Sequence, residues 1–290
     1  FEGFRIMKTT YYINGNWRQK DIDFLNSLGF KSPPFTELGY NHFTVTDKDL
    51  FDKIVQYFNG KDGLFKKRKP EGFNASPASV SFNKEEFNSA NIYNLRFTGD
   101  SLGNPEPFES YPFNTFNFEC VECLSGKTQM HNFRMNPKKL KKHQKSFILF
   151  DYDIIFFEID FYISFLKPLG LNSRDIINHK TGEVLQEVVQ LDIPEAKSKL
   201  VIQGHEFGES EICDGTGKTQ YGMQTLDFFP PFEEEFDFTI CKTREEFIEG
   251  LKRILISRDF MKLLVEHKIV KYNQYQLTPV KKDKHSSSAL

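Results

Sequence analysis

The chain has little cysteine for its length. Only Cys120, Cys123, Cys213 and Cys241 occur among its 290 residues. A small secreted domain held by disulfides would be shorter and richer in cysteine. The N-terminus also lacks a basic segment followed by an apolar run, so it predicts no signal peptide. We therefore expect reduced thiols and a cytoplasmic protein.

An excess of one charge is missing as well. The chain carries 38 Lys and Arg against 40 Asp and Glu, a formal net charge of −2. This balance predicts no overall attraction to nucleic acid or to anionic membranes. The most apolar stretch, residues 147–166, contains four acidic residues. An acid near the centre of a bilayer costs roughly 2.5–3.5 kcal/mol on insertion scales, so this stretch is not expected to span a membrane.

Common catalytic signatures are also absent. The chain has no Gly-x-Ser-x-Gly and no His-Glu-x-x-His. Residues 214–219 (Asp-Gly-Thr-Gly-Lys-Thr) are similar to the end of a phosphate-binding loop, but Ile212 stands where the first glycine is required. A tight glycine turn is therefore the preferred interpretation. Residues 125–129 (Ser-Gly-Lys-Thr-Gln) and 217–220 (Gly-Lys-Thr-Gln) are similar and predict matching hairpin turns.

Phenylalanine is the abundant residue, with 32 copies against one Trp. It favours strands and buries a large area, which predicts a Phe-filled core, with a Phe-lined ligand cavity as the alternative. Short segments with strand or helix periodicity predict an α+β fold of mixed or antiparallel sheets flanked by short helices. The Gly- and Pro-rich residues 99–118 are the best linker candidate. The expected regions are a cloning remnant at 1–6, an N-terminal domain at 7–110, a C-terminal domain at 111–280 and a polar tail at 281–290.

The last fifty residues have the clearest local signals. Phe236, Phe238 and Ile240 alternate as in a half-buried strand. Residues 243–246 (Thr-Arg-Glu-Glu) fit a capping box, which predicts a helix. Ser257 is a good N-cap for a second helix, and a last strand is expected from Val270. Residues 158–171 and 254–269 share one order of strand, serine and apolar helix, which indicates two similar subdomains or a chance recurrence.

The cysteine spacing suggests a metal. In residues 120–123 (Cys-Val-Glu-Cys), two residues between the thiolates let both reach one tetrahedral ion. A closed site needs two more ligands, which Cys213 and Cys241 could supply, with His131 and His205 in reserve. A second Cys-x-x-Cys is absent. Two interpretations stay open: structural zinc on Cys120, Cys123, Cys213 and Cys241, or four reduced cysteines and no cofactor.

Asp151 and Asp153 suggest an enzyme. They follow an apolar run and lie on one face of a predicted strand end. The pair resembles the Asp-x-Asp of metal-dependent glycosyltransferases, in which two carboxylates hold a divalent cation against a nucleotide diphosphate. The chain before it lacks a doubly wound series of strands and helices with a nucleotide crevice.

The acidic and aromatic segment 228–238 suggests a binding surface. Phenylalanines flank a run of acids next to Pro230 and Pro231. This segment is either a solvated loop or a docking surface for a basic partner, because opposite charges steer association and aromatic rings anchor it. The residues expected to contact a partner are Phe232, Glu233, Glu234, Glu235 and Asp237.

The C-terminal region resembles the bacterial immunity proteins that neutralise polymorphic or contact-delivered toxins, in particular the double-CxxCG group. The resemblance rests on the lead-in 226–229, the strand 236–240, the helix after Ser257 and the ending 278–280 (Thr-Pro-Val), with a weaker extension to residues 120–123. The chain departs from the group in lacking a glycine after Cys123 and a second cysteine pair.

The resemblance implies a cytoplasmic protein that binds a toxin and blocks it without turnover. It favours binding over catalysis, and a cognate protein toxin, basic by the charge argument above, over nucleic acid or membrane as the partner. Two alternatives stay open. One is the metal-dependent transferase built on Asp151 and Asp153, and the other is a non-catalytic accessory subunit of a larger assembly.

Overall fold

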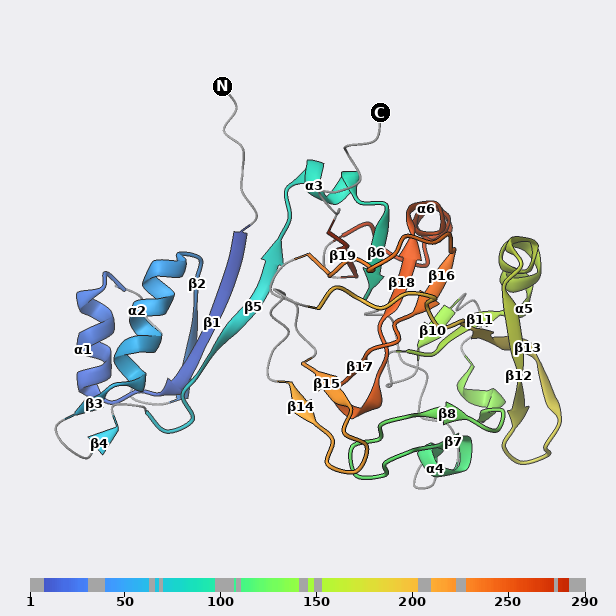
Figure 1. Ribbon diagram of the computed structural model, residues 1–290, viewed down its shortest axis with the longest axis horizontal. Coiled ribbons are helices and arrows are strands. Elements are labelled where there is room, and N and C mark those ends of the chain that lie inside the picture. Colours follow the sequence, from blue (N-terminus) through green and yellow to red (C-terminus); the bar gives the residue numbers. More distant parts are fainter. Residues whose placement is uncertain are drawn as a thin grey trace. The chain divides into compact units, whose positions relative to one another are not determined.

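The computed structural model describes residues 8–30, 40–62, 66–67, 70–96, 107, 111–140, 146–148, 153–202, 210–222, 228–273 and 276–281. It confirms the α+β class, because short helices accompany several mostly antiparallel sheets (Figure 1). The chain divides into two compact units, Phe1–Glu86 and Phe87–Leu290, here called unit 1 and unit 2. No helix within the described ranges combines the length and the apolarity needed to cross a membrane.

Unit 1 is a three-stranded antiparallel sheet with two helices. Its central strand β1 (Lys8–Asn16) pairs with β2 (Tyr40–Val45) and β5 (Asn74–Ser81). Helices α1 (Gln19–Ser27) and α2 (Lys48–Asn59) pack on this sheet, and β3 (Lys61–Asp62) and β4 (Lys66–Lys67) form a small separate hairpin. Asp47 caps α2 by accepting a hydrogen bond from the backbone N–H of Leu50 at 3.0 Å.

The core of unit 1 is aromatic. Trp17 is buried and its ring lies 5.5 Å from that of Phe58 and 5.8 Å from that of Phe43, measured between centroids. Such ring pairs add to the free energy gained by burying apolar area. Phenylalanine therefore serves here as core filling.

Unit 2 contains two larger sheets. The four-stranded sheet has the order β16 (Ile240–Lys242), β18 (Ile254–Ser257), β6 (Ile92–Leu95) and β19 (Leu277–Pro279). The five-stranded sheet has the order β10 (Ser146–Ile148), β11 (Ile155–Glu158), β13 (Val184–Asp192), β12 (Asn172–Asn178) and β9 (Arg134–Met135). Because β6 pairs with β18 and β19, unit 2 begins well before the boundary expected at residue 110.

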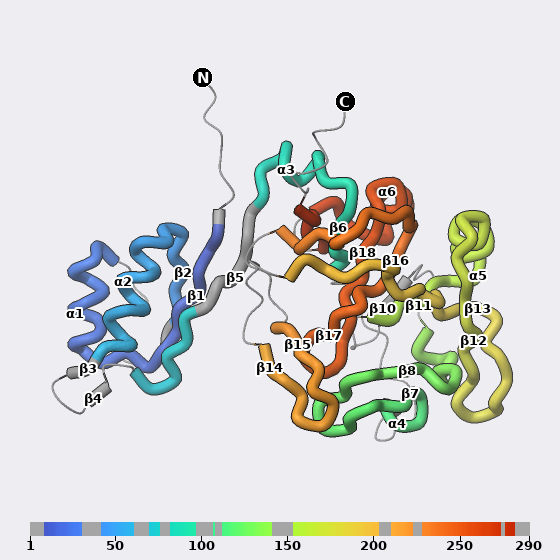
Figure 2. The backbone as a smooth tube through the Cα atoms, in the orientation of Figure 1, coloured from blue at the N-terminus to red at the C-terminus, as the bar shows by residue number. Residues whose placement is uncertain are grey.

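Two small hairpins complete the sheets of unit 2. Strand β7 (Phe116–Asn117) pairs with β8 (Thr128–Gln129), and β14 (Glu211–Ile212) pairs with β15 (Thr219–Tyr221). Strand β17 (Glu246–Phe247) joins β15 in parallel. In Figure 2 the turns of the green β7–β8 hairpin and the orange β14–β15 hairpin meet at one edge of the unit.

The helical segments of unit 2 are short. They are α3 (Lys84–Ser89), which spans the boundary between the units, α4 (Tyr111–Thr115), η3 (Pro137–Lys139), α5 (Ile159–Phe161), η4 (Tyr162–Leu166), η5 (Lys167–Leu169), η6 (Ile248–Gly250) and α6 (Arg258–Glu266). The predicted cap of α6 is confirmed, since the Ser257 hydroxyl accepts from the backbone N–H of Phe260 at 3.2 Å.

The predicted capping box at residues 243–246 is wrong. Thr243 is fully buried, and its hydroxyl accepts from the backbone N–H of Arg253 at 3.0 Å and donates to the carbonyl of Glu245. Glu246 lies on β17 instead of in a helix. Both side chains are therefore used for tertiary contacts, which outweigh the local helix signal.

Two strand predictions near the C-terminus are also corrected. The strand expected over 236–240 begins only at Ile240, and the last strand begins at Leu277 instead of Val270. Residues 236–239 lie outside the sheet, where the rings of Phe232, Phe236 and Phe238 contact one another. The alternation in this segment reflects a cluster of rings and not a strand.

Candidate functional site

Three of the four cysteines come together. The Sγ atoms of Cys120, Cys123 and Cys213 all lie within 4.8 Å of one another, and we call them the cysteine cluster. Cys120 and Cys123 belong to the turn between β7 and β8, and Cys213 to the turn between β14 and β15. Residues 93 positions apart in the sequence thus meet because the two hairpins meet.

Cys241, expected as the fourth ligand, does not belong to this cluster. It is buried on β16 among Phe229, Phe247 and Leu255, in an apolar part of the core. Burial raises the pKa of its thiol to about 12, so it stays protonated at neutral pH. The reserve ligand His131 is also outside the cluster, and His205 lies outside the described residues.

The two cysteine turns have the same backbone geometry. The N–H of Cys120 donates to the carbonyl of Ser125 at 3.2 Å, and the N–H of Cys213 donates to the carbonyl of Lys218 at 2.9 Å. In each turn the bond spans five residues. When the turns are aligned on this bond, Cys120 matches Cys213, and Cys123 matches Thr216.

The residue after that position confirms the match. Leu124 has φ of 57° and Gly217 has φ of 68°, so both turns contain one left-handed residue at the same place. Glycine adopts this conformation readily, whereas leucine is strained in it. The strand pairing agrees with this alignment. Phe116 faces Gln129, which centres the first hairpin between residues 122 and 123, and Glu211 faces Gln220, which centres the second at the equivalent point between residues 215 and 216.

The hairpins expected from the repeated Gly-Lys-Thr-Gln are therefore present, but in another register. That similarity would align Gly126 with Gly217, two positions away from the alignment that the hydrogen bonds show. The shifted alignment hides the equivalence of Cys123 and Thr216. Sequence reasoning missed Thr216 for this reason, and the Cys-x-x-Thr-Gly spacing of residues 213–217 is the signal that could have found it.

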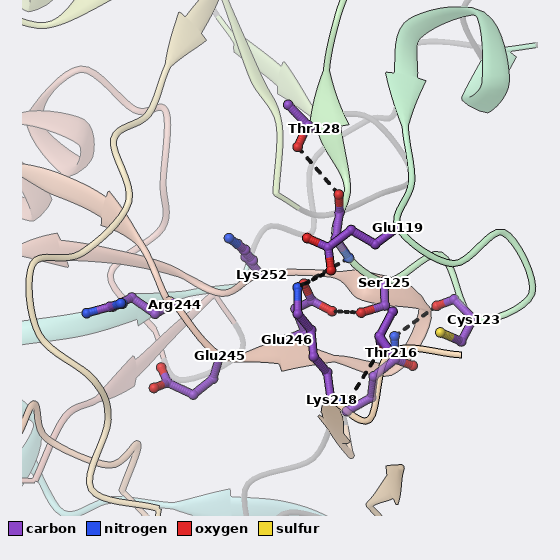
Figure 3. Close-up of polar contacts among 12 residues, drawn as sticks. Glu119, Cys123, Ser125, Thr128, Thr216, Lys218, Arg244, Glu245, Glu246 and Lys252 are labelled. Carbon is purple, nitrogen blue, oxygen red and sulfur yellow. Dashed lines mark hydrogen bonds and ion pairs between the residues drawn. The ribbon is translucent and has the colours of Figure 1, made fainter. Parts of the chain in front are cut away.

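Glu246 connects the first turn to β17. Its carboxylate accepts from the Ser125 hydroxyl at 2.5 Å and from the backbone N–H of Gly126 at 3.0 Å (Figure 3). Ser125 and Glu246 are both buried. These two bonds satisfy the carboxylate and hold the turn against the sheet, a role that sequence reasoning did not assign to Glu246.

Further contacts connect the two turns directly. The Gln220 amide donates to the carbonyl of Cys123 at 2.8 Å, and Lys218 Nζ lies 2.6 Å from Glu119 Oε2 (Figure 3). Backbone approach is also close, because a Cβ added to Gly215 would lie 3.1 Å from the Sγ of Cys120. The turns are thus packed together without a large side chain between them.

The thiols of the cluster affect one another. The hydrogen bonds that Cys213 receives from the Cys123 thiol and the Thr216 hydroxyl lower the pKa of Cys213. Burial raises the pKa of Cys123, and its hydrogen bond to Cys213 acts in the same direction. The pKa of Cys213 is therefore below that of Cys123, and the thiolate is the form of a cysteine that attacks or binds a metal.

A polar cavity of about 850 Å³ lies beside the turns. Its lining has cations and carboxylates together, among them Lys127, Lys218, Arg244, Glu245 and Glu246. At its edge Lys252 forms an ion pair with Glu195. Because its walls carry both signs of charge, this cavity is not built for a ligand of one charge.

The predicted Asp-x-Asp pair is found only in part, because Asp151 lies outside the described residues. Asp153 is buried, with its carboxylate 2.9 Å from Lys127 Nζ and 3.8 Å from Lys242 Nζ. Burial alone would raise the pKa of Asp153, but the two lysine charges outweigh it and lower the pKa. Asp153 is thus a buried ion-pair partner.

The acidic and aromatic residues form a second candidate site. A groove of about 520 Å³ is lined by Phe232, Glu235, Phe236, Asp237 and Phe238 together with neighbouring residues. Phe232 is buried, with its ring centroid 4.8 Å from that of Phe236. The carboxylate-bearing residues of this segment are exposed: Glu233, Glu234, Glu235 and Asp237. We call these four the acidic quartet.

The acidic quartet is free of internal pairing. None of its carboxylates makes an ion pair or a side-chain hydrogen bond within the ranges that the structure describes. The backbone beneath it is fixed, since the N–H of Glu234 donates to the Ser198 hydroxyl at 2.9 Å and that of Glu233 to the Lys199 carbonyl at 2.8 Å.

No protein-family model, no curated protein and no solved structure matches this chain.

Proposed function

We propose that the chain is a cytoplasmic immunity protein that binds a bacterial protein toxin and blocks it without turnover. The observation that carries the proposal is the groove lined by Glu235 and Asp237 of the acidic quartet. The groove supplies aromatic surface, and the quartet supplies exposed negative charge on a fixed backbone. A partner that suits it has a basic surface with an apolar side chain at its centre.

Charge complementarity supports this choice of partner. Exposed like charges repel one another, so four unpaired acids in five residues contribute little to folding. Opposite charge on a partner raises the association rate by steering, most strongly at low salt. The phenylalanines beside the quartet are the residue type that then anchors a complex through burial.

The transferase alternative has less support from the described residues. Asp153 would have to leave Lys127 and Lys242 before it could hold a divalent cation. Two lysines close to a cation site oppose binding of that cation. Nucleotide-sugar binding that needs a metal and is lost in Asp151→Ala would overturn the immunity proposal in favour of the transferase.

The test begins in the native host. The full chain is used to capture partners, and the product of the neighbouring reading frame is co-expressed with it. A stable one-to-one complex that abolishes the toxicity of that product is the expected result. Capture of a large assembly without any toxic member would instead support an accessory subunit.

A matched pair of variants then tests the groove. The quartet variant Glu233→Gln, Glu234→Gln, Glu235→Gln, Asp237→Asn should slow association about tenfold or more at low salt and reduce the salt dependence of the rate. The control removes four other exposed acids: Asp160→Asn, Asp175→Asn, Glu183→Gln and Glu187→Gln. Equal slowing in both variants would show that overall charge acts, and not the groove.

A further inference from the structure

We propose that the cysteine cluster is a zinc site with three thiolate ligands and an oxygen ligand in the fourth position, at the corner formed by Thr216. The site belongs to Cys120, Cys123 and Cys213 and excludes Cys241. This zinc proposal is independent of the proposed toxin partner, because none of the three cysteines lines the acidic groove.

The distances fit a tetrahedral ion. Zinc binds thiolates at about 2.3 Å, which places two thiolates of one tetrahedron about 3.8 Å apart. The three Sγ atoms lie within 4.8 Å of one another, so rotation of the side chains brings them to that separation. Cys120 and Cys123 supply two ligands from one turn, and Cys213 supplies the third from the other.

The donor set selects the class of metal. Three thiolates are soft ligands, which favour zinc over magnesium, calcium or manganese. Among the described residues no carboxylate or histidine belongs to the group. The site is therefore a sulfur site, unlike the oxygen site that Asp151 and Asp153 would make.

Thr216 defines the fourth position. In the superposed turns it takes the place of Cys123, and each is followed by a left-handed residue. Thr216 lies in the same turn as Cys213, where its N–H donates to the carbonyl of Cys213 and its hydroxyl accepts from the N–H of Lys218, each at 3.3 Å. A threonine at a cysteine corner leaves that corner to an oxygen ligand, either its own hydroxyl or a water molecule next to it.

The ion would act as a clamp. Most residues of the turn 213–218 are exposed, and in the turn 120–125 the apolar Val121 is exposed and Leu124 only half-buried, so the two turns bury little apolar area against each other. Binding of a structural metal contributes folding free energy directly because the unfolded chain has no preformed site. The ion would thus fix the two hairpins to each other where Gln220 and Lys218 already connect them.

The first test is metal content and affinity. The full chain, reconstituted with zinc under reducing conditions and dialysed, should retain about one equivalent of zinc. Cys213→Ser should lose it, while Cys241→Ser, the matched control for a buried cysteine, should retain it. Less than about a tenth of an equivalent in the wild type, or equal loss in both variants, overturns the proposal.

The second test adds a ligand instead of removing one, so it does not depend on a variant that fails to fold. Thr216→Cys should create a four-thiolate site. Cobalt is used as the probe, and its sulfur-to-metal absorption should rise by about one third as three thiolates become four. Zinc affinity, measured by competition with a chelator, should rise at least about tenfold. An unchanged cobalt spectrum, or a disulfide between two cluster cysteines under reducing conditions, contradicts the site.

Discussion

The buried and the exposed carboxylates of unit 2 differ in every contact they make. Asp153 and Glu246 are buried, and each is fully engaged, the first by two lysines and the second by Ser125 and Gly126. The acidic quartet is exposed and unpaired within the described part of the chain. The difference separates acids that hold the fold from acids that remain available to a partner.

The physical reason is the cost of desolvation. A buried charge without a partner is strongly destabilising, so burial requires compensation. An exposed carboxylate is solvated by water and needs none. Acids that stay unpaired on a well-ordered backbone are therefore the better candidates for intermolecular contact, and each prediction below tests whether the two groups really differ in this way.

The largest effect is expected at Asp153. Asp153→Asn removes the charge and leaves Lys127 and Lys242 in the core without their counter-ion. Breaking a buried pair in this way should lower the free energy of unfolding by about 3–5 kcal/mol. Urea denaturation of the full chain, monitored through the unfolding of unit 2, measures this loss of unfolding free energy.

The control for that prediction is a half-exposed pair. Asp192 lies 3.0 Å from Arg174, and both side chains are partly in water. Asp192→Asn should cost only about 0–1 kcal/mol because solvent screens the interaction. If the two variants lose the same stability, burial does not set the value of these acids and the comparison fails.

A dependence on pH follows from the same residue. The lysine charges hold the pKa of Asp153 below its ordinary value despite burial. A lowered pKa stabilises the folded state at pH values above the unfolded pKa, about 3.9, and that contribution is lost as pH falls through the lower folded pKa.

Acid titration of stability checks this dependence. Wild type and Asp153→Asn should converge as the pH falls below about 4, since protonation removes the charge that the substitution removes. Their difference should stay constant between about pH 5 and 7. A difference that instead grows as the pH falls below 4 would show that the Asp153 carboxylate is not stabilised by the lysines.

A smaller effect is expected at Glu246. Glu246→Ala leaves the Ser125 hydroxyl and the Gly126 N–H without their acceptor, which should cost about 1–3 kcal/mol. Lys218→Ala leaves these two hydrogen bonds in place and removes only partly exposed charge pairs, with Glu119 at 2.6 Å and with Glu246 at 3.9 Å, which should cost about 0–1 kcal/mol. If the two variants lose the same unfolding free energy, Glu246 stabilises the fold through its charge and not through its hydrogen bonds.

Local signals were sufficient for much of the fold. Helix α6 was predicted from the capping residue Ser257, and the cap is present. Residues 243–246 show the limit of such signals. The partners of Glu246 lie about 120 positions earlier in the chain, and no local pattern reveals them. Tertiary contact therefore decided the structure where a capping box was predicted.

The candidate sites were predictable to different degrees. The spacing of Cys120 and Cys123 indicates a shared ligand site by itself, and the Cys-x-x-Thr-Gly spacing of residues 213–217 is the one weak local signal that distinguishes Cys213 from Cys241. Only the pairing of β14 with β15 places Cys213 at the cluster, and only the four-stranded sheet places Cys241 in the core. The acidic segment was recognisable in sequence, while its groove depends on residues from β6 and β18.

The smallest stability effect is expected for the acidic quartet. Removing its four charges should change the unfolding free energy by less than about 0.5 kcal/mol, because exposed side chains without partners contribute little to folding. A slight gain is reasonable, since like charges at neighbouring positions repel one another. The same variant should nevertheless show the largest change in partner association. Neutralising the quartet could instead destabilise unit 2 by more than about 1 kcal/mol. These carboxylates would then stabilise the fold as Asp153 and Glu246 do, and the result would contradict the proposal that the acidic groove is a binding surface.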